Sequence, residues 1–239
     1  MKISPKGIFI TGTDTGVGKT YVASRIAEEL RCRGIDAGVM KPVETGCKKV
    51  RGELHPSDAL ALMHAAGVRD VLSLVNPYRF SWPLAPLVAA GLEGKRIDTD
   101  RICKAFEALS QRHEFLIVEG AGGILVPLTE RYCYLDLAGD LGLPVVIVAR
   151  PGLGTINHTL LTVKALQERK AKIAGVVFNY AESRKKGTAE RTSPAVIERI
   201  SGIRLIGTVH YRSANAEGMV DNILSPRSRR GERMDLGGQ

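Results

Sequence analysis

The sequence has few cysteines, few aromatic residues and no long hydrophobic run, and each absence excludes a class of protein. Cys32, Cys47, Cys103 and Cys133 are far apart, and no two of them form a C-x-x-C pair. This spacing predicts reduced thiols, as in the cytoplasm, rather than a disulfide framework or a zinc site. No apolar stretch approaches the roughly 20 residues that cross a bilayer, and the opening residues carry no signal-peptide pattern. We therefore expect a cytoplasmic protein without a membrane-spanning segment.

Aromatic residues make up only 5% of the chain, although its net charge is +9. Basic residues gather at positions 184–186 and in the stretch SPRSRRGER at positions 225–233. Neither stretch interleaves aromatic residues with its charges, as stacking on bases would require. We interpret the first as a solvated loop and residues 225–239 as a disordered tail, and we predict no nucleic-acid partner. A mild positive field also suits anionic substrates.

What the chain does contain is an alternation of apolar runs and amphipathic stretches. We predict buried strands at residues 7–11, 37–41, 115–119, 145–149, 173–179 and 205–209. These runs are continuously apolar, as are parallel strands that are covered on both faces. Helical patterns separate them, and no linker divides the chain. The sequence therefore predicts an α/β fold: one domain over residues 1–224, with a mostly parallel central sheet and helices on both faces.

Capping residues predict where several helices begin and end. Gly34 ends the helix that follows the first strand. Asp98 or Thr99 caps a helix in the middle of the chain. Ser193-Pro194 predicts the start of a later helix, with serine as the cap and proline at the first helical position.

The stretch GTDTGVGKT, residues 12–20, follows the first predicted strand and opens the first predicted helix. It matches the phosphate-binding P-loop G-x-x-x-x-G-K-[ST], except that Gly12 stands one residue too early. Such a loop points its N–H groups at an anion, backed by the helix N-terminus. Lys19 would reach the β- and γ-phosphates of ATP, and the Thr20 hydroxyl would bind Mg²⁺. The alternative, a capped turn with a surface lysine, does not explain the order of strand, glycines, Gly-Lys-Thr and helix. We predict a P-loop NTPase.

Two carboxylates are candidate Mg²⁺ ligands. Glu119 ends the predicted strand in FLIVEGAGG, where a buried carboxylate is costly unless it meets a cation. Mg²⁺ takes few protein ligands and completes its shell with phosphate and water. Asp58, in PSDAL, is a further candidate, but its spacing alone favours a capping role for Ser57 or Asp58 at a helix start.

The stretch KPVETG places Lys41 where a buried strand meets the ligand-binding edge of the sheet. Lys41 either pairs with Glu44 or Asp58, or stabilises negative charge on a second, non-nucleotide substrate. Thr45 offers a hydroxyl nearby. Periodicity does not decide between these interpretations.

Taken together, GTDTGVGKT, KPVETG, SDAL, NPY, EGAGG with VPL, and LGTINH resemble the dethiobiotin synthetases in order and in approximate spacing. The resemblance runs from Ile8 to Asn179. It implies an ATP- and Mg²⁺-dependent enzyme of biotin biosynthesis that joins CO₂ to diaminopelargonic acid (7,8-diaminononanoate). In this family the carbamate of one amine attacks the γ-phosphate, and the second amine then closes a cyclic urea. The products are dethiobiotin, ADP and phosphate.

The resemblance also implies roles for individual residues. The catalytic residues are Lys41 and Lys19. The metal ligands are Thr20, Asp58 and Glu119, which replaces capping as the expected role of Asp58. The ATP-binding residues are Gly16, Val17, Gly18, Lys19, Thr20, Asp58, Glu119, Gly120, Ala121, Gly122 and Asn179. The substrate-binding residues are Thr13, Thr15, Lys41, Thr45, Gly154, Thr155, Ile156 and Asn157.

The family binds the diamine at a homodimer interface, so the resemblance implies that residues 154–157 act from the neighbouring subunit. The helix start at LGTINH suits the carboxylate of the diamine. Asn179 would read the adenine edge, but His210 stands where the family commonly has proline, which leaves the nucleotide preference open. The alternative function is a partitioning or septum-site ATPase. Such proteins typically carry a lysine in the place held here by Asp14.

Overall fold

The computed structural model describes residues 6–180, 187–210 and 216–225. Six parallel strands form the central sheet in the order β12-β11-β10-β1-β7-β2. Their bounds are β1 (Lys6–Gly12), β2 (Ala37–Met40), β7 (Phe115–Gly123), β10 (Val145–Ala149), β11 (Ile173–Asn179) and β12 (Leu205–Val209). Each matches a strand predicted from the sequence. The α/β fold with a parallel central sheet is confirmed.

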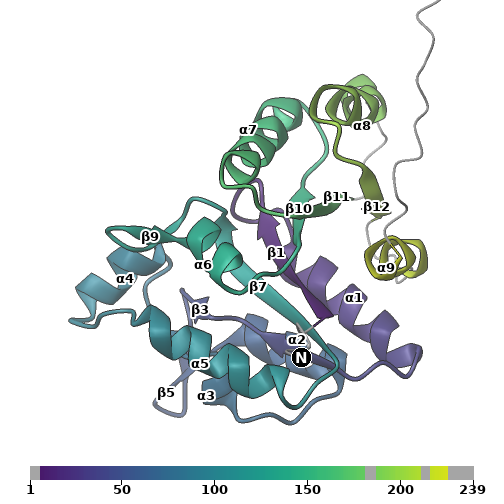
Figure 1. Ribbon diagram of the computed structural model, residues 1–239. Helices are drawn as coiled ribbons and strands as arrows, with labels where there is room; N and C mark the ends of the chain where they lie inside the picture. Colours follow the sequence, from purple (N-terminus) through teal and green to yellow (C-terminus); the bar gives the residue numbers. More distant parts are fainter. Residues whose placement is uncertain (1–5, 181–186, 211–215, 226–239) are drawn as a thin grey trace, which may run out of the picture.

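Helices cover both faces of this sheet (Figure 1). Their bounds are α1 (Lys19–Cys32), α2 (Ser57–Ala66), α3 (Leu72–Val75), α4 (Pro86–Leu92), α5 (Thr99–Ser110), α6 (Tyr134–Asp140), α7 (Thr155–Glu168), α8 (Thr188–Ser201) and α9 (Glu217–Leu224). On one face α1 packs beside α2 and α9, whereas α5, α6 and α7 lie on the other, with α8 beside α7. Among the described residues, no helix has the length and apolar character needed to span a bilayer.

Short strand pairs lie outside the central sheet. β3 (Val43–Glu44) pairs in parallel with β6 (Tyr78–Arg79). β4 (Lys48–Val50) and β5 (Glu53–His55) form one antiparallel hairpin, and β8 (Pro127–Thr129) and β9 (Tyr132–Cys133) form another. The β3–β6 pair matters for function, because it fixes the segment that follows β2.

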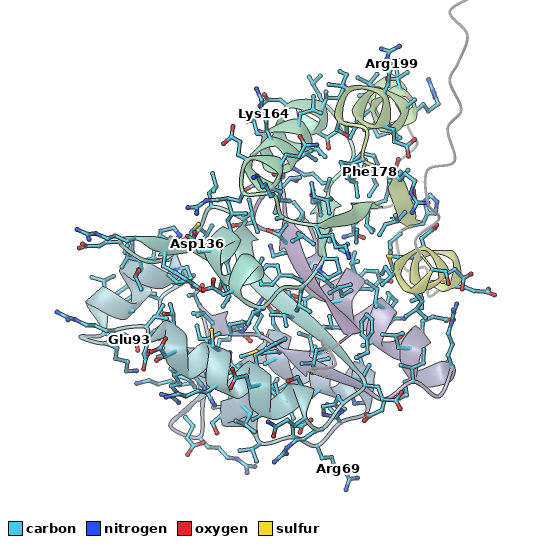
Figure 2. All side chains as sticks on the ribbon, in the orientation of Figure 1. Arg69, Glu93, Asp136, Lys164, Phe178 and Arg199 are labelled. Atoms are coloured by element: carbon cyan, nitrogen blue, oxygen red, sulfur yellow. The ribbon has the colours of Figure 1, made fainter. Side chains whose placement is uncertain are left out.

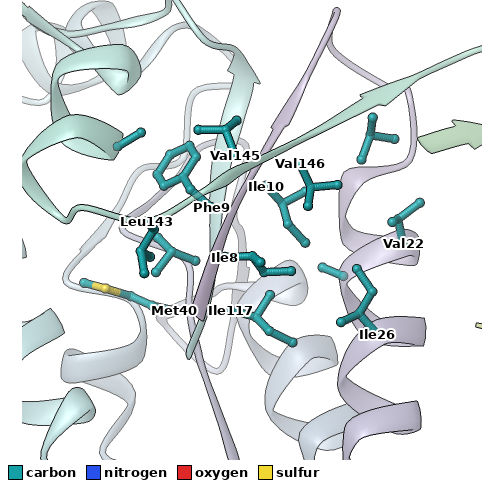
Figure 3. Close-up of a cluster of buried hydrophobic side chains, with 14 of the residues drawn as sticks. Ile8, Phe9, Ile10, Val22, Ile26, Met40, Ile117, Leu143, Val145 and Val146 are labelled. Carbon is teal, nitrogen blue, oxygen red and sulfur yellow. The ribbon is translucent and has the colours of Figure 1, made fainter. Parts of the chain in front are cut away.

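The central strand β1 shows why the apolar runs are continuous. Ile8 and Ile10 pack toward α1 (Figure 3), whereas Phe9 points to the opposite face, where its ring centroid lies 6.1 Å from that of Tyr134 in α6. All four side chains are buried. Both faces of the strand therefore remove apolar surface from water, which is a main source of folding free energy. At the surface, Figure 2 shows Arg69, Lys164 and Arg199 pointing away from the body of the molecule.

Two of the three predicted helix boundaries are confirmed. Gly34 follows α1 in the left-handed conformation (φ 73°), and its N–H donates to the backbone oxygen of Arg31. The Asp98 side chain accepts hydrogen bonds from the backbone of Asp100 and Arg101, so Asp98 caps α5.

The predicted start at Ser193-Pro194 is wrong, because α8 begins at Thr188 and both residues lie inside it. The Ser193 hydroxyl donates to the Ala189 backbone oxygen instead of capping the helix. Pro194 has no N–H for the carbonyl of Glu190, four residues earlier. That carbonyl accepts a hydrogen bond from the Tyr180 hydroxyl at 3.5 Å. A donor from another element therefore helps the helix to tolerate its proline.

The strand β7 is longer than predicted. It continues through the glycines to Gly123, so Glu119 lies in the middle of the strand, opposite Ile10, and not at its end. β2 ends at Met40, which leaves Lys41 just beyond it. The basic residues 184–186 and almost all of the predicted tail lie outside the described residues.

Candidate active site

A cleft of about 620 Å³ opens at the carboxyl ends of β1 and β2, beside the middle of β7. This is the edge at which parallel α/β sheets bind their ligands. Eleven residues predicted from the sequence line it: Thr15, Gly16, Gly18, Lys19, Thr20, Lys41, Thr45, Asp58, Glu119, Ala121 and Gly122. The cleft therefore brings together the P-loop, the residues after β2, the start of α2 and β7.

The P-loop closes tightly on itself. A Cβ atom at Gly12 would lie 2.7 Å from the Asp14 backbone oxygen and 2.8 Å from Cγ2 of Val17, so only glycine fits there. Gly16 (φ 74°) and Gly18 (φ 88°) adopt the left-handed conformation, which glycine takes without strain. The glycine that stands one residue early therefore serves the inner packing of the loop.

Lys19, the first residue of α1, is buried, and its Nζ donates to the Asp14 backbone oxygen at 3.4 Å. Burial and, after it, the charge of Lys41 lower its pKa to about 8, against the opposing pull of nearby carboxylates. A bound phosphate would favour the charged ammonium again. Lys19 is thus a buried donor whose charge is best satisfied by an anion in the cleft.

Two carboxylates from distant parts of the chain, on the buried Glu119 and on the partly exposed Asp58, pair with the buried Lys41. Its Nζ lies 2.5 Å from Oε1 of Glu119 and 3.2 Å from Oδ2 of Asp58. The Thr20 hydroxyl donates to the same Glu119 oxygen at 2.8 Å. Burial by itself lowers the pKa of Lys41, but the charges of Glu119 and Asp58 outweigh it and raise the pKa above its usual value. Lys41 is therefore a fixed positive charge.

Glu44 takes the capping role that the sequence suggested for Ser57 or Asp58. Its carboxylate accepts hydrogen bonds from the backbone N–H of Asp58 (2.9 Å) and of Ala59 (3.0 Å) at the start of α2. Burial raises the pKa of Glu44. The Asp58 carboxylate, which does not cap the helix, faces Lys41 and the cleft. Of the two ion pairs considered for Lys41, the structure contains the one with Asp58.

The three predicted metal ligands are suited to Mg²⁺. Oε2 of Glu119 is buried and has no hydrogen-bond partner among the residues described, and an orphaned carboxylate oxygen of this kind requires a cation or a donor. Thr20 and Asp58 add two further oxygen donors, the type that Mg²⁺ prefers. Within the described ranges, no cluster of three or more His, Cys, Asp and Glu side chains could hold a metal.

The remaining predicted residues do not line the cleft. Asn179 is buried beneath the P-loop, where its Nδ2 donates to the Val17 backbone oxygen at 2.9 Å. A Cβ atom at Gly18 would lie 1.9 Å from that nitrogen. Thr13 donates its backbone N–H to Val148 in β10, and Gly120 is a buried residue of β7. Asn179 thus supports the loop from below, and Thr13 ties it to β10.

The predicted carboxylate-binding turn also lies outside the cleft. Gly154 caps α7 in the left-handed conformation (φ 90°), and Thr155, Ile156 and Asn157 form the first turn of that helix. An ion pair of 3.1 Å between Arg150 and Asp14 joins the segment before this turn to the P-loop. Asp14, which stands where partitioning ATPases have a lysine, therefore has a structural partner.

Sequence reasoning missed the apolar wall of the cleft. This wall consists of Pro83, Leu84, Ala85, Pro86 and Val126. Hydrogen bonds from Gly46 to Trp82 and from Cys47 to Phe80 hold the segment before it against the residues after β3. The prolines in SWPLAP were a possible signal, but their place opposite the lysines depends on tertiary structure.

A glycine-rich loop between β1 and α1, with lysine and threonine at the start of the helix and a parallel sheet behind it, defines a P-loop NTPase. A family model described as an AAA domain matches residues 6–217. A solved ParA family ATPase from Chlorobium tepidum superposes with a TM-score of 0.55 at 15% identity, over 94% of this chain and 100% of that one. At this identity the likeness shows the fold alone.

Curated relatives define the family more narrowly. The chain is 44% identical over 212 residues to the ATP-dependent dethiobiotin synthetase BioD of Thermodesulfovibrio yellowstonii, which covers 86% of this chain and 88% of that protein. It is 52% identical over 174 residues to the protein of the same name from Anaeromyxobacter dehalogenans, covering 73% and 76%. The chain belongs to the dethiobiotin synthetase family, as its motifs predicted.

Proposed function

We propose that this protein is an ATP-dependent dethiobiotin synthetase, which closes the cyclic urea of dethiobiotin from 7,8-diaminononanoate, CO₂ and ATP, with release of ADP and phosphate. The main supporting observation is the presence of two buried lysines in one cleft. Lys19 comes from the P-loop and Lys41 from the end of β2. A nucleotide needs the first lysine. The second, facing an apolar wall, suits a second substrate that has an anionic reacting group and an alkyl chain.

Each wall of the cleft has its own task. The backbone N–H groups from Gly16 to Thr20 and the ammonium of Lys19 bind the phosphates. Lys41 stabilises negative charge on the carbamate and on the transferred phosphoryl group. Thr15 and Thr45, which line the cleft, bind the diamine end of the substrate together with Thr13 of the same loop. The wall around Leu84 contacts its alkyl chain.

Thr20, Asp58 and Glu119 would hold Mg²⁺, which neutralises phosphate charge when bound. Glu119 also fixes Lys41, because both Lys41 and Thr20 contact its Oε1. Gly120, Ala121 and Gly122 bring β7 backbone, without bulky side chains, next to the phosphates. Val17 belongs to the phosphate-binding loop, and Asn179 holds Val17 from below and contacts the adenine. The ring centroid of His210 lies 5.3 Å from that of Tyr180. We expect His210 to influence which nucleotide the protein prefers.

We further propose a cytoplasmic homodimer in which residues 154–157 of the neighbouring subunit bind the carboxylate of the diamine. Leu153 is fully exposed, and Leu161 on α7 and Leu125 are about 60% exposed (59% and 62%). Exposed apolar side chains just before α7 and on it, such as Leu153 and Leu161, suit an interface between subunits.

The decisive experiment measures phosphate release with ATP, Mg²⁺ and bicarbonate, in the presence and absence of 7,8-diaminononanoate. We expect release to depend on the diamine, and we expect dethiobiotin in the product by mass spectrometry. Lys41→Met is the matched control, because it retains the P-loop. Rapid ATP hydrolysis that is indifferent to the diamine would favour a nucleotide-switched ATPase instead.

A further inference from the structure

The ammonium of Lys41 lies among the atoms that are proposed to bind the metal ion. It is 2.5 Å from Oε1 of Glu119, 3.2 Å from Oδ2 of Asp58 and 3.3 Å from the Gly120 backbone oxygen. The Thr20 hydroxyl donates to the same Oε1. One cation thus already contacts both carboxylates of the proposed metal site.

This arrangement satisfies a strict electrostatic requirement. The Glu119 side chain is fully buried (0% exposed) and Lys41 nearly so (3%). An unpaired charge in such a place is strongly destabilising, so the carboxylate requires a cation in the absence of ligands. A divalent ion at Glu119 and Asp58 would stand beside the ammonium and repel it. The two cations therefore compete for the same pair of carboxylates.

We propose that Lys41 and the divalent metal ion exchange places: Lys41 holds the carboxylates before the metal binds, and the arriving ion releases its ammonium toward the second substrate. The inference rests on the metal ligands of the proposed function. It links metal loading to catalysis, because Lys41 reaches the carbamate only after Glu119 and Asp58 have received another cation. It also gives Lys41 a positioning role, since the lysine holds the carboxylates together before the ion arrives.

The other buried lysine of the cleft provides a matched control. Lys19 lies in the same cleft, but its Nζ donates to a backbone oxygen and not to a carboxylate. Lys19→Met and Lys41→Met remove the same charge, but only the second removes the direct competitor for the metal ligands. A nearby opposite charge changes the proton affinity of a carboxylate about 10- to 1000-fold.

The first test titrates Mn²⁺ alone, without nucleotide, into the wild type and both variants, and follows binding by electron paramagnetic resonance. We expect Lys41→Met to bind Mn²⁺ at least about tenfold more tightly than the wild type, with a clearly smaller gain for Lys19→Met. Equal gains in the two variants, or no gain in Lys41→Met, would overturn the exchange.

The second test needs no variant, which matters if Lys41→Met does not fold. Crystals of the wild type are grown with and without Mn²⁺ and ATP, and anomalous scattering locates the ion. The exchange requires Mn²⁺ on Glu119, with the Lys41 ammonium no longer within hydrogen-bond distance of that carboxylate. Mn²⁺ on Oε2 with Lys41 still on Oε1 would refute it, as would an ion bound away from Glu119. Neither test contains the diamine, so the two proposals can fail separately. If the protein passes both tests but makes no dethiobiotin, the proposed function is wrong and the exchange still holds.

Discussion

The two lysines of the cleft belong to regions built in opposite ways. Lys19 opens α1 directly after the P-loop, and its Nζ bonds the backbone of Asp14, five residues earlier. Lys41 depends on Glu119, 78 residues away. The Lys19 ammonium is thus held within the P-loop segment, whereas the Lys41 ammonium is held only once β2 and β7 are paired. We therefore propose different roles for the two ammonium groups: Lys19 binds the nucleotide, and Lys41 acts on the second substrate.

The largest expected effect separates the two lysines by function. Lys41→Ala should lower kcat about a hundredfold, or about 3 kcal/mol, because it removes the charge facing the reacting anion. ATP affinity should change little. Lys19→Ala should weaken ATP binding as well as slow turnover, because we propose that its ammonium binds the phosphates. Stopped-flow kinetics and calorimetry measure both parameters, and circular dichroism verifies folding. If the Lys41→Ala enzyme had a normal kcat at saturating substrates, the proposed catalytic role of Lys41 would be wrong.

A side chain added inside the P-loop should lower the stability of the protein. Gly18→Ala should cost about 2–3 kcal/mol of unfolding free energy, because it combines a left-handed backbone with a clash. Its Cβ would lie 1.9 Å from Nδ2 of Asn179, which is bonded to Val17. Gly34→Ala is the control: Gly34 has a similar φ of 73° but open space around it, so we expect a loss of only about 1 kcal/mol. Urea denaturation measures both. Equal losses would mean that the Asn179 contact contributes nothing.

The carboxylates around Lys41 can be tested through the Mg²⁺ dependence of turnover. Asp58→Asn and Glu119→Gln should each raise the Mg²⁺ concentration for half-maximal activity about tenfold, because each removes negative charge with little change of shape. A Mg²⁺ titration of turnover measures the effect. Ser57→Ala is the control, since its hydroxyl lies 3.4 Å from Glu44 and does not line the cleft. A normal Mg²⁺ requirement in Asp58→Asn would exclude Asp58 as a ligand.

The start of α7, which we propose acts across a dimer interface, is a third region that can be tested. Asn157→Asp retains the size of the side chain but sets a negative charge against the carboxylate of the diamine. Because residue 157 is exposed and solvent screens its charge, we expect about fivefold weaker diamine binding. ATP binding should be unchanged. Calorimetric titration of each ligand, after light scattering has verified a dimer, gives the answer. Parallel loss of both ligands would indicate general damage.

The smallest effect concerns the amino end of the sheet, far from the ligand-binding edge. His113 bridges Asp36 and Asp70, with 2.8 Å between each ring nitrogen and a carboxylate oxygen. Burial lowers the pKa of His113, but the two carboxylates outweigh it and raise the pKa above 6.5. A raised folded-state pKa means that the stabilisation is complete below the unfolded pKa and is lost as pH rises through the folded value.

We therefore expect the wild type to lose stability relative to His113→Gln as the pH rises above about 6.5. Urea denaturation at a series of pH values measures the difference, and turnover should not follow it. A constant difference between the two proteins across this range would contradict the charged bridge.

Much of this protein could be predicted from its sequence because the relevant physics is local. A strand buried on both faces must be continuously apolar, so β1, β10 and β11 could be predicted from their apolar sequences alone. The P-loop was recognisable because its glycines, Lys19 and Thr20 act on one anion within nine residues. The same motifs gave the family.

Other features were decided only by tertiary structure, because they depend on which distant segments meet. Glu44, 14 residues before Asp58, accepts the hydrogen bonds at the start of α2. The Asp58 carboxylate does not cap the helix and therefore lines the cleft. Pairing with β1 carries β7 past Glu119 to Gly123, so the carboxylate is buried in mid-strand beside Lys41. Pro194 stays inside α8 with the hydroxyl of Tyr180 beside the carbonyl it leaves free. In each case a local rule identified the residue, and a contact from another part of the chain determined its role.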